Sequence, residues 1–326
     1  SSVSYTLGAN VENLTLVGNG YSMGAGNSLA NQIKGNASDN SLMGLAGNDF
    51  LQGFAGSDRM DGGIDADTME GGLGDDTYVV NDLKDVLIEG INAGYDSVES
   101  GVSYTLQANF ENLYLTEDAR PTIFTYFTHA IGNASDNYLQ GNSGSNFLDG
   151  REGSDALYGN GGEDTLMGGA GDDLLYADQG YNVMDGGEGN DTYELYLTYG
   201  MEADVATYGW GDGSQDIISL SAWNDQGNGV QLSDLKVERV QAGQWYDMDH
   251  RNYYGVGAGT TVALRLQGQS DPYLSGTAYI NLFNHDGTQA GGISEIRLNG
   301  ETISFEAIKA MLQTEGTAGD DVLFGF

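Results

Sequence analysis

The sequence contains no cysteine and only two prolines among its 326 residues. Without cysteine the chain has no disulfide and no thiolate metal ligand, although this absence does not fix the compartment. Basic side chains are also scarce, since 11 of them face 48 acidic ones and give a formal net charge of -37. So large an excess of negative charge disfavours nucleic acid and anionic lipid as partners and makes cations the natural complement.

Long apolar runs are missing as well. No stretch approaches the roughly 20 apolar residues that a membrane span needs. The first residues, "SSVSYTLGAN", lack the basic region and the apolar region of a signal peptide. A hydrophobic content of 39% and 20 tyrosines nevertheless exceed what an acidic disordered tail contains. The composition therefore indicates a folded, strongly acidic protein.

Glycine is abundant, with 52 residues, and much of it lies in a repeat of nine residues. Each unit starts at a glycine, carries aspartate or asparagine at its sixth position and has an apolar or aromatic residue at its eighth. In the first array the sixth positions are Asn40, Asp49, Asp58, Asp67 and Asp76, and the eighth are Leu42, Leu51, Met60, Met69 and Tyr78. In the second array, over 132–194, the sixth positions are Asn137, Asn146, Asp155, Asp164, Asp173, Asn182 and Asp191. The eighth positions there are Leu139, Leu148, Leu157, Leu166, Leu175, Met184 and Tyr193.

A longer repeat encloses the nonads. "VSYTLGANVENLTL" at Val3 returns as "VSYTLQANFENLYL" at Val102. The two copies of "GNASDN" are 97 residues apart, whereas the array ends, "DDTY" and "NDTY", are 115 apart. The second array is therefore longer by two whole nonads. This indicates that a pair of nonads is the structural unit.

The nonad predicts a turn followed by a short strand. Its six residues of glycine, asparagine and aspartate favour a turn, because glycine permits positive φ and Asn or Asp tolerate it. The other three, with an apolar residue in the middle, predict a very short strand. Two such units close one coil of a flattened parallel solenoid, so residues 18 apart stack at a coil spacing of about 4.8 Å. Leu51 is then expected over Met69, and Met60 over Tyr78.

The same stacking places Asp49 next to Asp67 and Asp58 next to Asp76. Two like charges about 4 to 5 Å apart repel by roughly 3 to 4 kcal/mol at an effective dielectric of 20. Calcium takes oxygen ligands at about 2.3 to 2.6 Å, so two carboxylates across one ion lie about 5 Å apart, close to the coil spacing. Oxygen ligands, with no cysteine and only three histidines, favour a hard cation over zinc or copper. We therefore expect several Ca²⁺ ions.

The segments "GGLGDDTYV" and "GGAGDDLLY" resemble the pattern GGxGxDxUx, the calcium-binding nonapeptide of RTX (haemolysin-type) proteins. The long unit is similar to sequence between such arrays in large RTX proteins. The resemblance implies an all-β fold, a parallel β-roll or β-solenoid with calcium-binding turns over residues 1–194. The calcium arrays are expected at about 35–80 and 132–194, with calcium-free coils between them.

The resemblance also implies a set of ligands. In the family, one turn supplies the carbonyls of its second and fourth positions and its aspartate. The turn 18 residues later supplies the carbonyls of its first and third positions and its own aspartate. In the first array the implied sites are Leu45, Gly47, Asp49, Gly62, Ile64 and Asp67, and then Phe54, Gly56, Asp58, Gly71, Leu73 and Asp76.

In the second array the best implied pairs are Asp155 with Asp173 and Asp173 with Asp191, whereas Asp164 has asparagine on both sides. Asn40 and Asn137 depart from the pattern, so weaker or empty sites are expected there. The implied sets are Asn142, Gly144, Asn146, Gly159, Gly161 and Asp164; Arg151, Gly153, Asp155, Gly168, Ala170 and Asp173; Asn160, Gly162, Asp164, Ala177, Gln179 and Asn182; and Gly169, Gly171, Asp173, Gly186, Glu188 and Asp191.

Residues 195–313 lack nonads and contain strand-like runs and a final segment, "ISFEAIKAMLQ", with helical spacing. This part resembles the haemolysin-type calcium-binding-related domain, which implies a mainly-β domain ending in a short helix. Its aromatic residues suit either a core or a sugar-stacking platform, and a core is the preferred interpretation. They are Trp210, Trp223, Trp245, Tyr246, Tyr253 and Tyr254. Residues 314–326 start a further repeat, so the chain is expected to be an excerpt of a larger protein.

No enzyme activity is predicted within this segment. "GYSMG" at Gly20 fits the GxSxG nucleophile pattern, but that elbow needs a following helix, and a degenerate nonad follows instead. Ser22 is therefore expected in a turn. The aromatic insertion Thr116 to Ala130 is expected to be an irregular coil or a cap, not a ligand site.

The first hypothesis is a calcium-dependent scaffold of a large secreted or cell-surface RTX protein, such as an adhesin, a surface-layer component or a toxin. The second is the calcium-binding tail of a secreted hydrolase, lyase or epimerase. A third is glycan binding by 195–313. Sites of the extracellular class bind calcium at about 10⁻⁴ to 10⁻³ M, so the chain is expected to stay loose inside the cell and fold outside it. The resemblance implies a type I secretion route, which exploits this behaviour. Calcium is the expected partner, with cell-surface glycan or neighbouring copies of the chain as further candidates.

Overall fold

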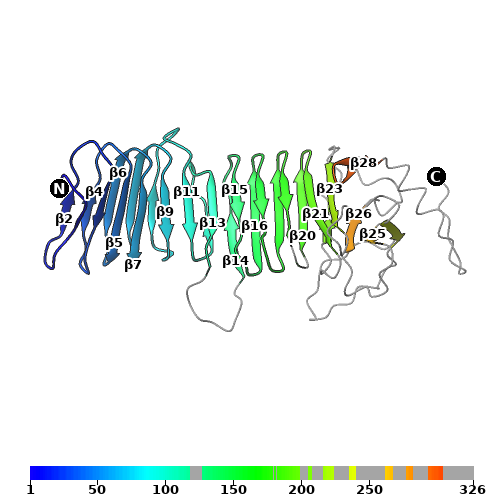
Figure 1. The fold of residues 1–326 in the computed structure, drawn as a ribbon, viewed down its shortest axis with the longest axis horizontal. Helices are drawn as coiled ribbons and strands as arrows, with labels where there is room; N and C mark the ends of the chain where they lie inside the picture. Colours follow the sequence, from blue (N-terminus) through cyan, green and yellow to red (C-terminus); the bar gives the residue numbers. More distant parts are fainter. Residues whose placement is uncertain are drawn as a thin grey trace, which may run out of the picture. The chain divides into compact units, whose positions relative to one another are not determined.

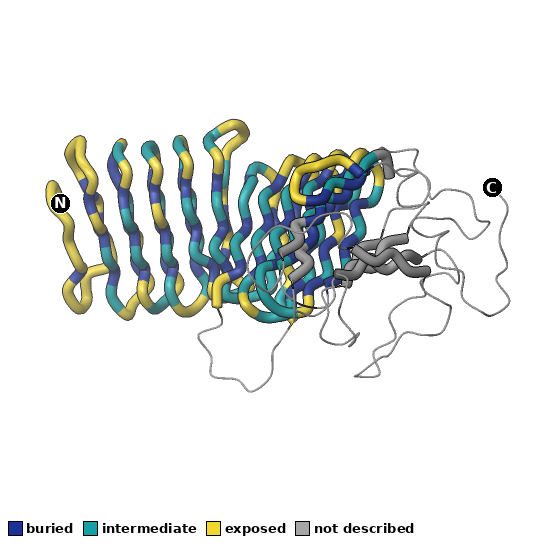
Figure 2. The backbone as a smooth tube through the Cα atoms, turned by 45° about the vertical axis from the view of Figure 1, so that its right-hand side comes forward, coloured by how far each residue is buried: buried dark blue, intermediate teal, exposed yellow. Residues whose placement is uncertain are grey.

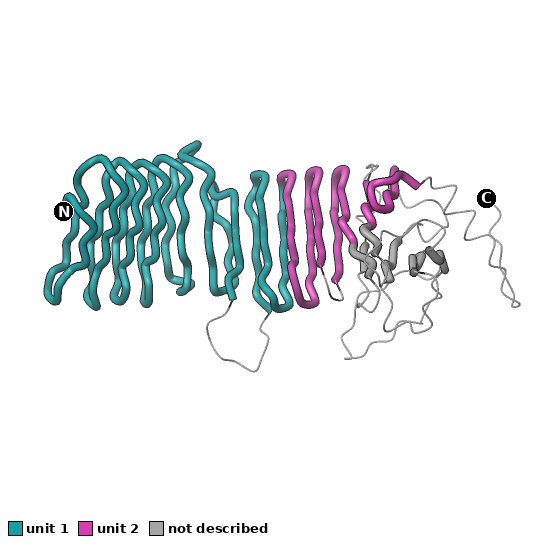
Figure 3. Tube along the Cα trace, viewed as in Figure 1, with its two compact units in different colours: residues 1–152 teal, residues 153–326 magenta. Residues whose placement is uncertain are grey.

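The computed structural model describes residues 1–117, 127–178, 180, 182–198, 205–207, 216–223, 235–239, 261–266, 277–281 and 293–303. They belong to two compact units, Ser1–Glu152 and Gly153–Phe326 (Figure 3). The regular elements of the described residues are all strands, and none of these residues forms a helix able to span a bilayer. Only Trp223 of the aromatic platform lies within these ranges. The other platform residues, Gln179, most of the predicted terminal helix and residues 314–326 lie outside what the structure describes.

In the first unit the strands alternate between sheets, and most strands pair in parallel with the strand two places ahead (Figure 1). One sheet contains β1 (Tyr5–Thr6), β3 (Ser22–Ala25), β5 (Asn40–Ala46), β7 (Arg59–Ile64), β9 (Thr77–Val80), β11 (Ser97–Ser100), β13 (Asn112–Leu115) and β15 (Tyr138–Gln140). A second contains β2 (Asn13–Thr15), β4 (Gln32–Lys34), β6 (Phe50–Ala55), β8 (Thr68–Leu73) and β10 (Val86–Ile88). A third contains β12 (Tyr104–Thr105), β14 (Thr128–Ile131) and β16 (Asn146–Glu152).

In the second unit the strands alternate between two sheets up to β23 (Asp216–Trp223). One sheet has the order β17 (Ala156–Tyr158), β19 (Leu174–Tyr176), β21 (Thr192–Thr198), β23, β27 (Ile293–Leu298) and β28 (Glu301–Ile303). The other has the order β18 (Thr165–Ala170), β20 (Val183–Glu188), β22 (Val205–Thr207), β26 (Thr277–Asn281), β25 (Thr261–Leu266) and β24 (Leu235–Arg239). Pairing is parallel except in the β24–β25, β25–β26 and β27–β28 pairs, which are antiparallel. The domain boundary near residue 195 stays a prediction.

Residues 18 apart lie side by side, as the repeat predicts. Leu51 pairs with Met69, and Met60 pairs with Tyr78. These eighth-position side chains are fully buried, and buried and less buried residues alternate along the strands (Figure 2). Burying such a side chain contributes about 1.5 to 3 kcal/mol. The chain is therefore an all-β parallel β-solenoid whose core is a set of apolar ladders.

The strands of the first array are longer than the nonad predicts. Strands β6, β7 and β8 have six residues each, so the expectation of three-residue strands is wrong there. Strand pairing continues past the apolar eighth position into the next nonad, where Leu45 pairs with Gly63 and Phe54 pairs with Gly72. Glycine at these positions lets neighbouring backbones approach closely. The turns shrink to residues 47–49, 56–58 and 65–67.

We expect Leu51→Ala to lower the free energy of unfolding by about 2 to 5 kcal/mol, because Leu51 is fully buried within the apolar ladder. Denaturant unfolding in saturating calcium measures this value. Leu83→Ala is the matched control, since Leu83 is 72% exposed and its loss should change the free energy by less than about 0.5 kcal/mol. Equal effects of the two substitutions would contradict the assigned core.

Candidate metal centre

The backbone of the glycine-aspartate corners has an unusual conformation at the second and fourth positions of the nonad. Leu45 and Phe54, at the second position, both have φ of 85°, and Gly47 and Gly56, at the fourth, have φ of 102° and 101°. Large L-residues rarely adopt positive φ, so the surrounding coils must impose it. The same pattern recurs in the second array at Arg151, Gly153, Asn160, Gly162, Gly169, Gly171, Gly187 and Gly189.

This conformation turns the backbone carbonyls toward the next coil. An ideal Cβ on Gly63 would lie 2.2 Å from the carbonyl oxygen of Leu45, and one on Gly72 would lie 2.1 Å from that of Phe54. Only glycine therefore fits opposite these carbonyls. Leu45 and Phe54 are two of the residues that the sequence resemblance implies as carbonyl ligands.

The aspartates of successive coils are in direct contact. The backbone N–H of Asp49 donates to Oδ1 of Asp67 over 2.7 Å, and that of Asp58 donates to Oδ1 of Asp76 over 2.7 Å. In the second unit the N–H groups of Asp155, Asp173 and Asp164 donate in the same way to Asp173, Asp191 and Asn182. The structure thus brings together the residues that the sequence pairs 18 apart.

The second carboxylate oxygen faces the first glycine of its own nonad. An ideal Cβ on Gly44 would lie 2.2 Å from Oδ2 of Asp49 and 2.4 Å from the carbonyl oxygen of Gly62. Gly53 has the same relation to Asp58 and Gly71, at 2.3 and 2.8 Å. A carboxylate oxygen and a carbonyl oxygen from the neighbouring coil therefore meet above a glycine.

These second oxygens are buried without a donor. Among the described residues, Oδ2 of Asp49, Asp58, Asp67 and Asp76 has no hydrogen-bond partner, and these side chains are at most 3% exposed. A buried carboxylate oxygen without a partner costs free energy. A calcium ion, which takes carboxylate and carbonyl oxygens together, satisfies both kinds of atom. The residues present therefore fit calcium.

Burial also shifts the acidity of these groups. It raises the pKa of Asp58 and of Asp67 to about 7, and that of Asp76 and of Asp173 to about 8. Backbone hydrogen bonds to Oδ1 oppose the shift, and neighbouring carboxylates add to it for Asp67, Asp76 and Asp173. Ionising such a carboxylate in the folded chain is unfavourable unless a cation compensates for its charge.

The asparagine corners at Asn40 and Asn146 are built differently. Oδ1 of Asn40 accepts the N–H of Asn36 over 2.7 Å, and Oδ1 of Asn146 accepts the N–H of Asn142 over 2.8 Å. The second-position residues Asn36 and Asn142 do not have positive φ. These turns close on their own hydrogen bonds, which include Gly144 N–H to Oδ1 of Asn142 over 2.9 Å.

Two of the implied second-array sets combine residues of both compact units. They are the set that pairs Asn146 with Asp164 and the set that includes Arg151, and both stay predictions. Gln179, from a third set, lies outside the described residues.

The carboxylate ladder extends beyond the nonads to residues that the sequence analysis missed. The N–H of Asp67 donates to Asp85, that of Asp76 to Asp96, and that of Asp191 to Asp216. Asp85 lies 18 residues after Asp67, so the strict period contained the signal for it. Insertions displace Asp96 and Asp216 from that period, and the repeat alone does not find them.

Ser22 lies in strand β3, not in a turn as expected. Its side chain is buried, and its hydroxyl donates to the carbonyl of Gly20 over 3.3 Å. The chain continues into strand β4, so no helix follows Ser22 and the nucleophile-elbow geometry is not formed.

Comparison with protein families matches the RTX calcium-binding nonapeptide repeat (4 copies). The match covers residues 26–53, 34–69, 44–78, 52–85, 131–166 and 158–193, and so includes both arrays. Repeats of this kind bind calcium in general, and their β-roll is typically non-catalytic. A search of curated proteins found no match.

The raised pKa values predict that the stability of the fold depends on pH in opposite directions with and without calcium. The pKa of these carboxyls is higher in the folded chain than the unfolded value of 3.8, so their protonated form stabilises the metal-free fold. This stabilisation is lost as the pH rises through about 7 to 8. In calcium-stripped buffer, the strand signal in circular dichroism should therefore be larger near pH 5 than near pH 8.

In saturating calcium the order should reverse, because protons compete with the ion for the same oxygens. A metal-free strand signal that grows from about pH 5 to about pH 8 would contradict the assigned burial of these carboxylates.

Proposed function

We propose that this chain, whose residues 26–85 and 131–193 carry RTX calcium-binding nonapeptide repeats, is a calcium-dependent structural module that folds when it binds several Ca²⁺ ions. One observation carries the proposal. Buried carboxylate oxygens without hydrogen-bond donors, such as Oδ2 of Asp49 and of Asp58, lie beside carbonyl oxygens of the next coil.

Charge makes the fold conditional on the ion. The chain has a formal net charge of -37, and its corner aspartates are stacked coil upon coil. Adjacent ionised carboxylates repel by roughly 3 to 4 kcal/mol per pair at an effective dielectric of 20. Calcium replaces this repulsion by attraction, and because the unfolded chain holds no such site, binding free energy becomes folding free energy.

The calcium affinity expected for such sites indicates where the chain folds. Extracellular calcium modules bind at about 10⁻⁴ to 10⁻³ M, far above resting cytosolic calcium, so the chain would stay loose inside a cell and fold outside it. The RTX resemblance supports passage through a type I secretion system and a secreted or cell-surface location in a bacterium. An acidic solenoid suits the stalk or scaffold of an adhesin, a surface-layer component or a toxin.

Removing calcium should abolish most of the strand structure at neutral pH. Circular dichroism of the chain in excess EGTA should resemble an unfolded chain, and adding calcium should restore the strand signal cooperatively. A strand signal that is complete in EGTA and unchanged by calcium would refute the proposal.

Two variants test whether the corner carboxylates bind the calcium that induces folding. Asp67→Asn keeps an oxygen that can accept the N–H of Asp49 but removes a buried charge, so the calcium midpoint should rise and fewer ions should bind. Asp65→Asn removes the same charge from an exposed residue of the same turn and should leave the midpoint nearly unchanged. Isothermal titration calorimetry measures both, and equal shifts would contradict the assignment of Asp67 as a ligand.

A further inference from the structure

The first nonad array ends at a coil that is not a nonad. Strand β10 pairs with β8 so that Val86, Leu87 and Ile88 lie opposite Thr68, Met69 and Glu70. The next residue, Glu89, therefore follows at the register of Gly71. One coil earlier, this register holds Gly71 opposite Gly53, with the carbonyl oxygen of Gly71 2.8 Å from an ideal Cβ on Gly53. A glutamate thus stands where the repeat supplies a glycine.

Tyr78 fixes the position of this glutamate. Its ring is fully buried, and its hydroxyl accepts the N–H of Gly71 over 2.7 Å. The hydroxyl also lies within hydrogen-bond distance of the Ile88 carbonyl, at 3.1 Å, and of the Glu89 carboxylate. An ideal Cβ on Gly71 would lie 2.3 Å from this hydroxyl, in the place that a glycine carbonyl takes in the preceding coils. Tyr78 therefore connects the last nonad to the side chain of Glu89.

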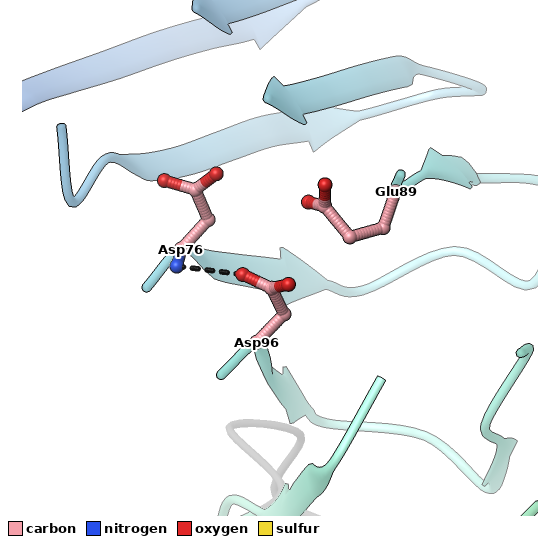
Figure 4. A group of neighbouring side chains, drawn as sticks. All are labelled: Asp76, Glu89 and Asp96. Atoms are coloured by element: carbon pink, nitrogen blue, oxygen red, sulfur yellow. Dashed lines mark hydrogen bonds between the residues drawn. The ribbon is translucent and has the colours of Figure 1, made fainter. Parts of the chain in front are cut away.

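Three carboxylates meet at this end. Asp76, Glu89 and Asp96 each offer an oxygen, and these oxygens lie within 4.8 Å of one another. Figure 4 shows the Glu89 carboxylate directed toward Asp76 and Asp96, with the Asp76 N–H donating to Asp96 over 2.8 Å. Asp76 and Asp96 are each only 1% exposed.

An independent observation points to a ligand here. Oδ2 of Asp76 and Oδ2 of Asp96 are both buried, and neither has a hydrogen-bond partner among the described residues. Only their Oδ1 atoms accept backbone N–H groups, from Asp58 and from Asp76. When they are ionised, two unsatisfied oxygens on buried side chains, beside a third carboxylate, require a positively charged neighbour.

The other row of corners, which precedes the strands of the second sheet, ends without unsatisfied carboxylate oxygens. There the ladder stops at Asp85, whose Oδ1 accepts the N–H of Asp67 over 3.1 Å. Its Oδ2 accepts the N–H groups of Asn81 and Asp82 over 3.4 and 3.2 Å. Backbone donors thus satisfy Asp85, whereas Asp96 keeps a bare oxygen. An unsatisfied oxygen at the end of a row therefore occurs in the row of corners that ends at Asp96, beside Glu89, and not in the row that ends at Asp85.

Backbone carbonyls of the last nonad are further candidate ligands at this end. Gly72 and Gly74, at the second and fourth positions of the last nonad, have φ of 114° and 118°, as the carbonyl positions of the other corners do. The Gly74 carbonyl oxygen lies 2.0 Å from an ideal Cβ on Gly94, so it faces the coil that supplies Asp96.

We propose that Asp76, Glu89 and Asp96 form a further calcium site that closes the first array and lies outside the nonad pairs. This site rests on the proposed function, because Asp76 is also a proposed ligand in the nonad pair that it forms with Asp58. The all-oxygen donor set suits a hard cation. Three carboxylates, against two in each nonad pair, make this site the tighter one, since affinity rises with the charge of the ligands.

Counting bound ions tests the proposal. Glu89→Gln retains the shape of the side chain and its hydrogen bond with Tyr78 but removes the charge, so native mass spectrometry at a calcium concentration too low to fill the nonad corners should show one ion fewer than the wild type. Glu70→Gln is the matched control. Glu70 lies in the neighbouring strand, outside the cluster, where its carboxylate accepts a hydrogen bond from Gln52 over 3.0 Å. It should keep the wild-type count, and an unchanged count in Glu89→Gln would overturn the proposal.

A second variant and a direct observation cover the case in which Glu89→Gln fails to fold. Asp96→Asn should also lose one ion while keeping the acceptor for Asp76 N–H, because Asn182 accepts the equivalent bond from Asp164. Crystals of the wild-type chain soaked with Mn²⁺ should show an anomalous peak between the three carboxylates. Peaks at the nonad corners with none at this end would refute this site alone, whereas peaks at neither place would refute the proposed function as well.

Discussion

Each aspartate corner places one carboxylate oxygen where the backbone of the preceding coil needs a hydrogen-bond acceptor. Because the N–H of Asp49 donates to Asp67, and that of Asp58 to Asp76, the stacking of coils itself draws the carboxylates into the interior. The Oδ2 atoms of Asp49 and Asp58 are then directed at a glycine and a carbonyl, without a donor. The coil register, the glycine positions and the need for a cation all follow from this one geometric constraint.

Asparagine corners meet the same constraint without a charge. After each long unit, the side-chain amide of an asparagine donates to carbonyls of the preceding coil, as Asn27 does to Val11 and Asn133 does to Phe110, both over 2.7 Å. An amide NH₂ group thus supplies the positive pole that, on the proposed function, a cation would supply at the aspartate corners. On that proposal, asparagine corners at the start of each array would form without calcium, whereas the aspartate corners that follow would depend on it.

The nine-residue period predicted the parallel solenoid, the 18-residue register and the aspartate pairs, because side-chain stacking in a solenoid depends only on sequence spacing. It did not predict the length of strands β6 to β8, since pairing through Gly63 and Gly72 depends on how closely two backbones approach. It also missed Asp96 and Glu89, because inserted residues break the phase while the coil still closes in space. The self-closed turn at Asn146 depends on local hydrogen bonds that spacing does not reveal.

Amide hydrogen exchange at the corner aspartates tests most directly whether the carboxylate ladder depends on calcium. The N–H groups of Asp49, Asp58 and Asp76 are buried donors to the carboxylate of the next coil, and their exchange reports whether the ladder is closed. With calcium, these amides should exchange as slowly as those of the apolar strands. In EGTA at neutral pH they should exchange at the rate of an unfolded chain. Equal protection with and without calcium would contradict the account.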